Sequence, residues 1–150
     1  MKHCVRVLAI GLVLVFAVQM FSDNRADVDL WGNFHFVSAL PGTQAFLHVN
    51  TYSFTDPAHP WINHEWGAQW IFHSIHARLG NAGLLLLKLV LGFILLFTLY
   101  RVARKECRSG ALIFFLLLGV VSTVGYGFST RPHLLSYLFY ALFLFVLRYH

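Results

Sequence analysis

The chain has 150 residues, of which 58% are hydrophobic and only 11% are charged, with a net charge of +5. A soluble domain carries about 25% charged residues, so this composition favours a membrane protein. The positive charges are scattered or lie beside hydrophobic segments, which does not indicate a nucleic-acid-binding surface. Two cysteines, Cys4 and Cys107, are too few for a disulfide framework.

Four hydrophobic segments predict an all-α membrane protein with about four transmembrane helices in a single membrane region over 1–150. They cover about 5–21, 82–100, 111–128 and 134–149. A crossing needs roughly 20 apolar residues, which the second and third segments provide, whereas the first is slightly short and the fourth only just long enough. The first segment lacks a small-x-small cleavage pattern at its end, which favours an uncleaved helix over a signal peptide.

The basic residues predict one orientation for these helices. Lys2 and Arg6 precede the first segment, and four more cations lie within 101–108, whereas the long segment 22–80 holds only Arg25 and Arg78. By the positive-inside rule, the N-terminus and the 101–108 loop are cytoplasmic, and 22–80 faces outward. We therefore expect a multi-pass protein of the cytoplasmic (inner) membrane, with both cysteines on the reducing side.

The outer loop 22–80 is too long for a simple connector. Its part 61–79 predicts an amphipathic helix that lies along the membrane interface and stops at Gly80-Asn81. The loop contains all four tryptophans, which are typical of an interfacial aromatic belt, and six of the nine histidines. These are Trp31, Trp61, Trp66 and Trp70, and His35, His48, His59, His64, His73 and His76.

Asp27 and Asp29 lie in the motif Asp27-Val28-Asp29-Leu30-Trp31, just after the first hydrophobic segment. The region 27–40 reads as a short helix or an extended piece. In an extended backbone, residues two apart share a face, so both carboxylates could hold a divalent cation such as Mg²⁺ or Mn²⁺. One of them could instead act as a general base. The simpler interpretation is that these acids cap the outer end of the first helix.

Two further motifs on the same side could bind a substrate. His64 and Glu65 stand at the start of the predicted interfacial helix, where they could bracket a site, or Asn63 could cap that helix while Glu65 complements its dipole. Arg131 and His133 lie in a short outer turn, where the arginine could bind a phosphate or merely anchor a helix end. Pro132 between them favours a helix start.

Other polar residues allow weaker interpretations. Lys88 lies inside the second hydrophobic segment, so it must snorkel outward or find a phosphate or carboxylate partner within the bundle. The six outer histidines raise the alternative of metal uptake, but their spacing fits no standard zinc pattern, and only His73 and His76 share a helical face.

Taken in order, these motifs resemble the N-terminal portion of bacterial polytopic glycosyltransferases of the GT-C type, which use polyprenyl-phosphate sugars. The resemblance rests on the ordered set and covers nearly the whole chain from Phe21 onward. Its elements are Asp27-Val28-Asp29-Leu30-Trp31, Tyr52-Ser53-Phe54-Thr55, Pro60-Trp61-Ile62-Asn63-His64-Glu65-Trp66 and Arg131-Pro132-His133-Leu134. Related enzymes often continue the first motif with Trp-His, where this chain has Gly32 and Asn33.

The resemblance implies a reaction in which a sugar passes from a lipid-linked donor to an acceptor on the outer face. It implies that Asp27 or Asp29 is the general base or a metal ligand, that His64 and Glu65 position the acceptor, and that Arg131 binds the donor phosphate. Enzymes of this type are much longer, so the chain is expected to be an N-terminal part that is inactive alone. The alternative is a non-catalytic multi-pass protein whose outer loop binds a partner or a metal.

Overall fold

The computed structural model describes residues 2–23, 27–38, 54–56, 59–60 and 62–150. The described residues are mainly helical, with no strand among them, which confirms the all-α prediction. In chain order the helices are α1 (Lys2–Phe21), α2 (Val28–Ser38), α3 (Trp66–Glu106), α4 (Gly110–Tyr126) and α5 (His133–Tyr149).

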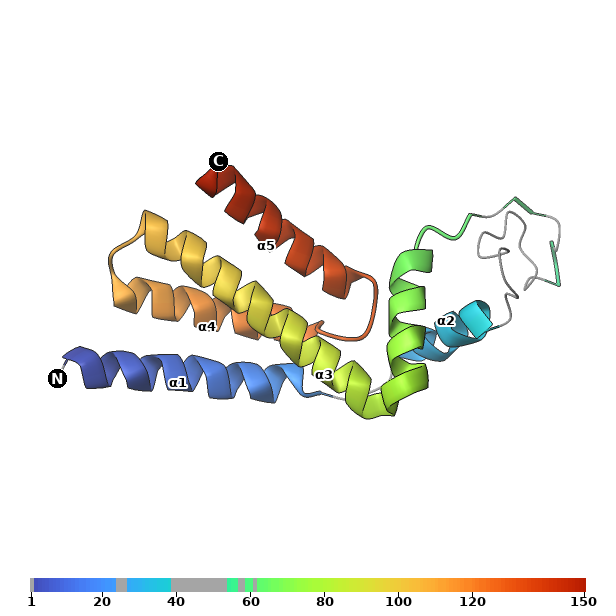
Figure 1. The fold of residues 1–150 in the computed structure, drawn as a ribbon, viewed down its shortest axis with the longest axis horizontal. Coiled ribbons are helices and arrows are strands. Elements are labelled where there is room, and N and C mark those ends of the chain that lie inside the picture. The colour runs from blue at the N-terminus through green and yellow to red at the C-terminus, as the bar shows by residue number, and fades with distance from the viewer. Residues whose placement is uncertain (1, 24–26, 39–53, 57–58, 61) are drawn as a thin grey trace.

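The helices form a bundle, and α2 and the first part of α3 lie outside it as a pair (Figure 1). In the bundle, α3 packs mainly along α5, and α1 packs mainly along α4. The short helix α2 lies beside the first part of α3, away from the bundle. The N-terminus, the α3–α4 connection and the C-terminus lie at the end of the bundle that is remote from α2.

Helix α3 bends at Gly80, where the backbone has φ 60° and ψ −154°. Only glycine adopts this conformation readily, because a Cβ atom would clash with the neighbouring peptide groups. The bend turns the first part of α3 toward α2 (Figure 1). The predicted stop at Gly80-Asn81 is thus a bend between two helical parts, and the first part begins at Trp66 rather than at residue 61.

Small residues bring the helices of the bundle close together near the C-terminal end of α1. A Cβ atom added to Gly92 of α3 would lie 2.5 Å from the ring of Phe21, and one added to Gly125 of α4 would lie 2.8 Å from Met20. Phe21 is fully buried, and its ring centroid lies 4.2 Å from that of Phe128. Such glycine contacts are typical of helix packing in membranes.

At the opposite end of the bundle, polar contacts join the last turns of α3 and α5. Lys105 Nζ donates to the carbonyl of Arg148 at 2.8 Å and lies 4.0 Å from the ring centroid of Tyr149. The Tyr149 hydroxyl donates to the carbonyl of Arg101 at 3.2 Å, and Arg148 forms an ion pair with Glu106. The basic residues in the last turns of the two helices therefore gather at one end of the molecule.

Among the residues that the structure describes, two helices are long and apolar enough to cross a membrane. They are α1, over Cys4–Phe21 with a mean hydropathy of 2.3, and α3, which contains an 18-residue window with a mean hydropathy of 2.5. Helices α4 and α5 are also apolar but have only 17 residues each. Length and composition thus suggest that two helices associate with a membrane. A buried core helix or a signal sequence meets the same criteria of length and composition.

Candidate functional site

The carboxylates of Asp27 and Asp29 lie at the N-terminus of α2, not on an extended strand. Asp27 directly precedes the helix, and its Oδ1 accepts a hydrogen bond from the backbone N–H of Asp29 at 3.0 Å. The backbone N–H of Leu30 donates to the carbonyl of Asp27 at 3.1 Å. This is the geometry of a helix N-cap, in which a side-chain oxygen satisfies an unpaired N–H of the first turn. The capping interpretation is therefore correct in kind, but the helix capped is α2 rather than α1.

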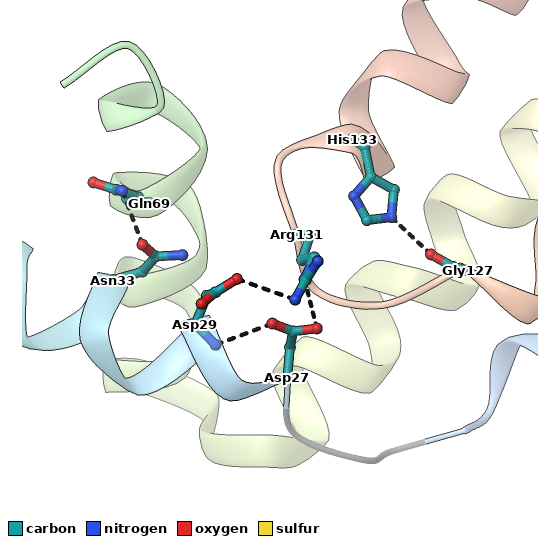
Figure 2. Close-up of polar contacts among 7 residues, drawn as sticks. All are labelled: Asp27, Asp29, Asn33, Gln69, Gly127, Arg131 and His133. Atoms are coloured by element: carbon teal, nitrogen blue, oxygen red, sulfur yellow. Dashed lines mark hydrogen bonds and ion pairs between the residues drawn. The ribbon is translucent and has the colours of Figure 1, made fainter. Parts of the chain in front are cut away.

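One guanidinium, that of Arg131, contacts both carboxylates (Figure 2). Its Nε lies 2.5 Å from Oδ2 of Asp27, and its Nη2 lies 3.0 Å from Oδ2 of Asp29. The Nε atom is buried without the alignment of a hydrogen bond, so its contact with Asp27 is chiefly an ion pair. Arg131 belongs to the α4–α5 connection, and the contact therefore joins α2 to the bundle.

The surroundings of this cluster stabilise its charges. Burial opposes ionisation of Asp27, but the N–H of Asp29, the contact with Arg131 and the nearby His133 together hold the pKa of Asp27 below its ordinary value of 3.8. The contact with Asp27 raises the pKa of Arg131 against partial desolvation, helped by the charges of Asp29 and Glu65. The cluster thus brings together an arginine and two carboxylates, with a third, Glu65, within electrostatic range.

His133 stands on the bundle side of the cluster. Its Nε2 lies 2.7 Å from the carbonyl oxygen of Gly127 (Figure 2), and its ring centroid lies 5.6 Å from that of Tyr137. Since a carbonyl can only accept, Nε2 carries the hydrogen in this contact. His133 begins α5, directly after Pro132, as the sequence predicts. It holds the α4–α5 connection that presents Arg131.

His64 and Glu65 lie just before the first part of α3. The His64 side chain is 82% exposed, and its Nε2 is 3.9 Å from Oε1 of Glu65. The backbone N–H of Glu65 donates to Oδ1 of Asn63 at 3.1 Å. Glu65 itself stands at the N-cap position of α3 and no side chain caps this helix, so the predicted capping role of Asn63 is wrong. The structure thus places Glu65 within the electrostatic range of Arg131, whereas His64 contacts Glu65.

A chain of buried side-chain amides, absent from the sequence-based prediction, joins α2 to α3. Asn63 Nδ2 donates to Oε1 of Gln69 at 2.7 Å, and Gln69 Nε2 donates to Oδ1 of Asn33 at 2.9 Å (Figure 2). Asn63 and Gln69 are buried. Buried amides of this kind fix the relative position of the elements that they join. The sequence offers no signal for the pairing, because Asn33 and Gln69 lie far apart along the chain.

Two other groups of polar residues have structural contacts. Lys88 is buried, and its Nζ donates to the backbone carbonyl of Asp23, so it has a partner inside the protein rather than snorkelling outward. On the first part of α3, His76 packs against Phe34 and Trp31 of α2, with ring centroids 4.8 and 5.8 Å apart. The His76 ring therefore contributes to the contact between α2 and α3.

No group of three or more His, Cys, Asp or Glu residues that could hold a metal occurs within the part of the chain that the structure describes. His48 and the first two residues of the motif Tyr52-Ser53-Phe54-Thr55 lie outside that part. Residues 54–55 form a bend. A divalent cation held by Asp27 and Asp29 would have to displace the guanidinium of Arg131 from both carboxylates.

No protein-family model, curated protein or solved structure matches this chain.

Proposed function

We propose that this chain is the N-terminal part of a membrane glycosyltransferase that moves a sugar from a polyprenyl-phosphate donor to an acceptor on the outer face. The contact of one arginine with two carboxylates at a single end of the bundle is the observation that carries this proposal. An arginine suits a donor phosphate, and a carboxylate suits the proton of an acceptor hydroxyl.

The surface of the molecule supports a membrane location. The 18-residue apolar window of α1 is only 17% buried within the molecule, and side chains such as Val5, Leu8 and Val15 are more than half exposed. A large exposed apolar face is stable when lipid covers it. The basic end of the bundle is the cytoplasmic end under the positive-inside rule. The cluster at the other end then faces outward. The helix α2 and the first part of α3, outside the bundle (Figure 1), carry the exposed tryptophans Trp31, Trp66 and Trp70.

The exposure of the two aspartates assigns them different roles in this proposal. The Asp29 side chain is 64% exposed, so an acceptor hydroxyl can reach it. Asp27 is only 15% exposed and caps α2, so it positions Arg131 and the helix. When the donor phosphate binds Arg131, the Asp29 carboxylate loses its ion pair and can face the acceptor hydroxyl instead.

In the transfer step, the acceptor oxygen forms a bond to the anomeric carbon of the sugar. The bond from that carbon to the phosphate oxygen breaks, and the electron pair leaves with the polyprenyl phosphate, next to Arg131. The acceptor proton passes to the Asp29 carboxylate. In this proposal Glu65 and His64, just before α3, contact the acceptor, and Mg²⁺ or Mn²⁺ could assist only if Arg131 moved aside.

The test uses the full-length gene product in membranes with radiolabelled polyprenyl-phosphate sugars. Asp29→Asn should lower kcat by about 100-fold or more, because general-base catalysis contributes about that much. Arg131→Gln should mainly raise KM for the donor. Asp56→Asn is the matched control, because Asp56 belongs to the same loop and its carboxylate contacts His59 at 3.1 Å. It should leave both constants unchanged.

The same assay addresses the alternative functions. Transfer that survives Asp29→Asn would contradict the assignment of the base. Loss of transfer on chelation, with recovery on adding Mg²⁺ or Mn²⁺, would assign the carboxylates to a metal instead. The non-catalytic alternative is favoured by one observation, that Arg131 neutralises both carboxylates and so ties α2 to the bundle. A gene product that transfers no sugar but needs the same residues to fold would support it.

A further inference from the structure

A large apolar cavity lies at the basic end of the bundle, far from the aspartate–arginine cluster. Its volume is about 910 Å³, and it is lined by α1, α3 and the start of α4. This volume lies at the upper end of the usual range of about 300–1,000 Å³ for ligand pockets. Its lining includes the buried side chains of Val13, Leu96, Ile113 and Leu117.

The cavity exists because only part of α1 packs closely against the neighbouring helices. Near its C-terminal end, Met20 and Phe21 sit against glycines of α4 and α3, where even a Cβ atom would collide. Toward its N-terminal end, the cavity separates α1 from α3 and α4, and residues such as Val5 and Leu8 are exposed. The cavity therefore lies beside the N-terminal part of α1, at the end at which the basic residues gather.

Two arginines line this otherwise apolar cavity. Arg6 comes from the second turn of α1, and Arg104 comes from the last turn of α3. The Nη1 atom of Arg104 makes a long contact with the carbonyl of Arg108, at 3.5 Å, which leaves the charge of Arg104 available to a ligand. The only acidic side chain described at this end of the bundle, that of Glu106, is already paired with Arg148. Tyr100, one turn before Arg104, also lines the cavity and adds a hydroxyl.

We infer that this cavity binds an anionic phospholipid of the inner leaflet, with its phosphate between Arg6 and Arg104 and an acyl chain along the apolar lining. The charge of the cavity mouth and the apolar character of its interior match the two halves of such a lipid. Cations at a membrane surface attract anionic headgroups, by about five-fold in affinity for each Lys or Arg. The inference rests on the proposed membrane location but not on the proposed sugar transfer.

The test is native mass spectrometry of the full-length gene product in detergent with phosphatidylglycerol or phosphatidylcholine of identical acyl chains. The wild type should retain phosphatidylglycerol about 25-fold more strongly, from two cations of about five-fold each. Arg6→Gln and Arg104→Gln should each remove about five-fold of this preference, and the double variant should abolish it. Arg108→Gln is the matched control, because it removes the same charge at the same end but does not line the cavity.

A second variant tests the apolar part of the site. Leu96→Trp should fill the cavity and weaken retention of both lipids, while the purified protein stays folded by circular dichroism. An equal effect of Arg108→Gln and Arg104→Gln would show general surface attraction and overturn the proposal. Leu96→Trp without effect on lipid retention would also overturn it, because another helix or a second copy of the chain would then fill the cavity. Sugar transfer is not measured, so failure here leaves the proposed function standing.

Discussion

Asp27 has two structural roles, because its two carboxylate oxygens point in different directions. Oδ1 accepts the hydrogen bond that caps α2, whereas Oδ2 faces the guanidinium of Arg131. The cap belongs to one helix, but the ion pair joins that helix to the α4–α5 connection. Removing the charge without removing the cap therefore separates the two roles.

Asp27→Asn should do this, because asparagine caps a helix about as well as aspartate but carries no charge. Thermal unfolding in detergent micelles should show a loss of stability at pH 7. The pKa of Asp27 is lowered in the folded protein, so its charge contributes stability above about pH 3.8 that is lost as the pH falls through the folded-state pKa. The difference between wild type and Asp27→Asn should therefore shrink below that pH.

Asp27→Ala completes the comparison, since alanine removes both the cap and the charge. It should be less stable than Asp27→Asn by about 1 kcal/mol, the usual contribution of an N-cap. This difference should persist in acid, because neither asparagine nor alanine titrates. Equal stability of the two variants would show that the cap contributes nothing to the fold. If the stability difference between the wild type and Asp27→Asn stayed constant down to pH 2, this would contradict the lowered pKa of Asp27.

At the scale of the elements, the bend at Gly80 places α2 and the first part of α3 beside the end of the bundle (Figure 1). Gly80→Ala should disfavour the bend, because alanine at φ 60° and ψ −154° is strained by about 1–3 kcal/mol. Spin labels at Ala77 and Tyr140, both exposed, would report the angle between the first part of α3 and α5. We expect a shifted or broadened distance distribution.

Gly119→Ala is the control for this experiment. Gly119 lies inside α4, and nothing lies within 4 Å of where its Cβ would be. Alanine is the better helix former there, so the distance distribution should not change and stability should stay equal or rise. If Gly80→Ala left the distances as unaffected as Gly119→Ala does, the bend would be set by packing rather than by the backbone freedom of glycine.

The helices and the site differed in how far the sequence could predict them. Uninterrupted apolar segments predicted α1, α4 and α5 to within three residues at each end, because a hydrophobic run needs no partner to be recognised. Segment 27–40 was ambiguous, because its apolar and aromatic residues fit a helix or a strand. Its helical state in the structure accompanies contacts with α3, through Gln69 and the histidine rings, that no local pattern encodes.

The cluster itself was predicted only as separate residues. The sequence singled out Asp27, Asp29 and Arg131, but placed the carboxylates near a metal or an acceptor rather than against the arginine. Their contact depends on the α4–α5 connection reaching the start of α2, which is a property of the packed bundle. The amides of Asn33 and Gln69 gave no signal at all, since single amides are common in loops and helix ends.

At the scale of the whole molecule, the two ends of the bundle have opposite character. One end carries the last turns of α3 and α5 with their cations, and the other carries the aspartate–arginine cluster and exposed tryptophans. In a membrane this polarity fixes the orientation, because cations favour the cytoplasmic side. Both proposals depend on it, since the cluster must face outward to meet a lipid-linked sugar and the arginine-lined cavity must face the inner leaflet.

The two native cysteines allow this orientation to be measured. Cys4 is exposed near the start of α1, Cys107 follows the end of α3, and both are free thiols. A membrane-impermeant maleimide applied to intact spheroplasts should leave both unlabelled, and should label them once the membrane is permeabilised. His64→Cys, in a chain with Cys4→Ser and Cys107→Ser, should be labelled from outside without permeabilisation, because the His64 side chain is 82% exposed. If the native thiols were labelled from outside and the His64→Cys thiol were protected, the orientation would be the reverse of the expected one. The carboxylates would then lie on the cytoplasmic side, which would contradict the proposed acceptor.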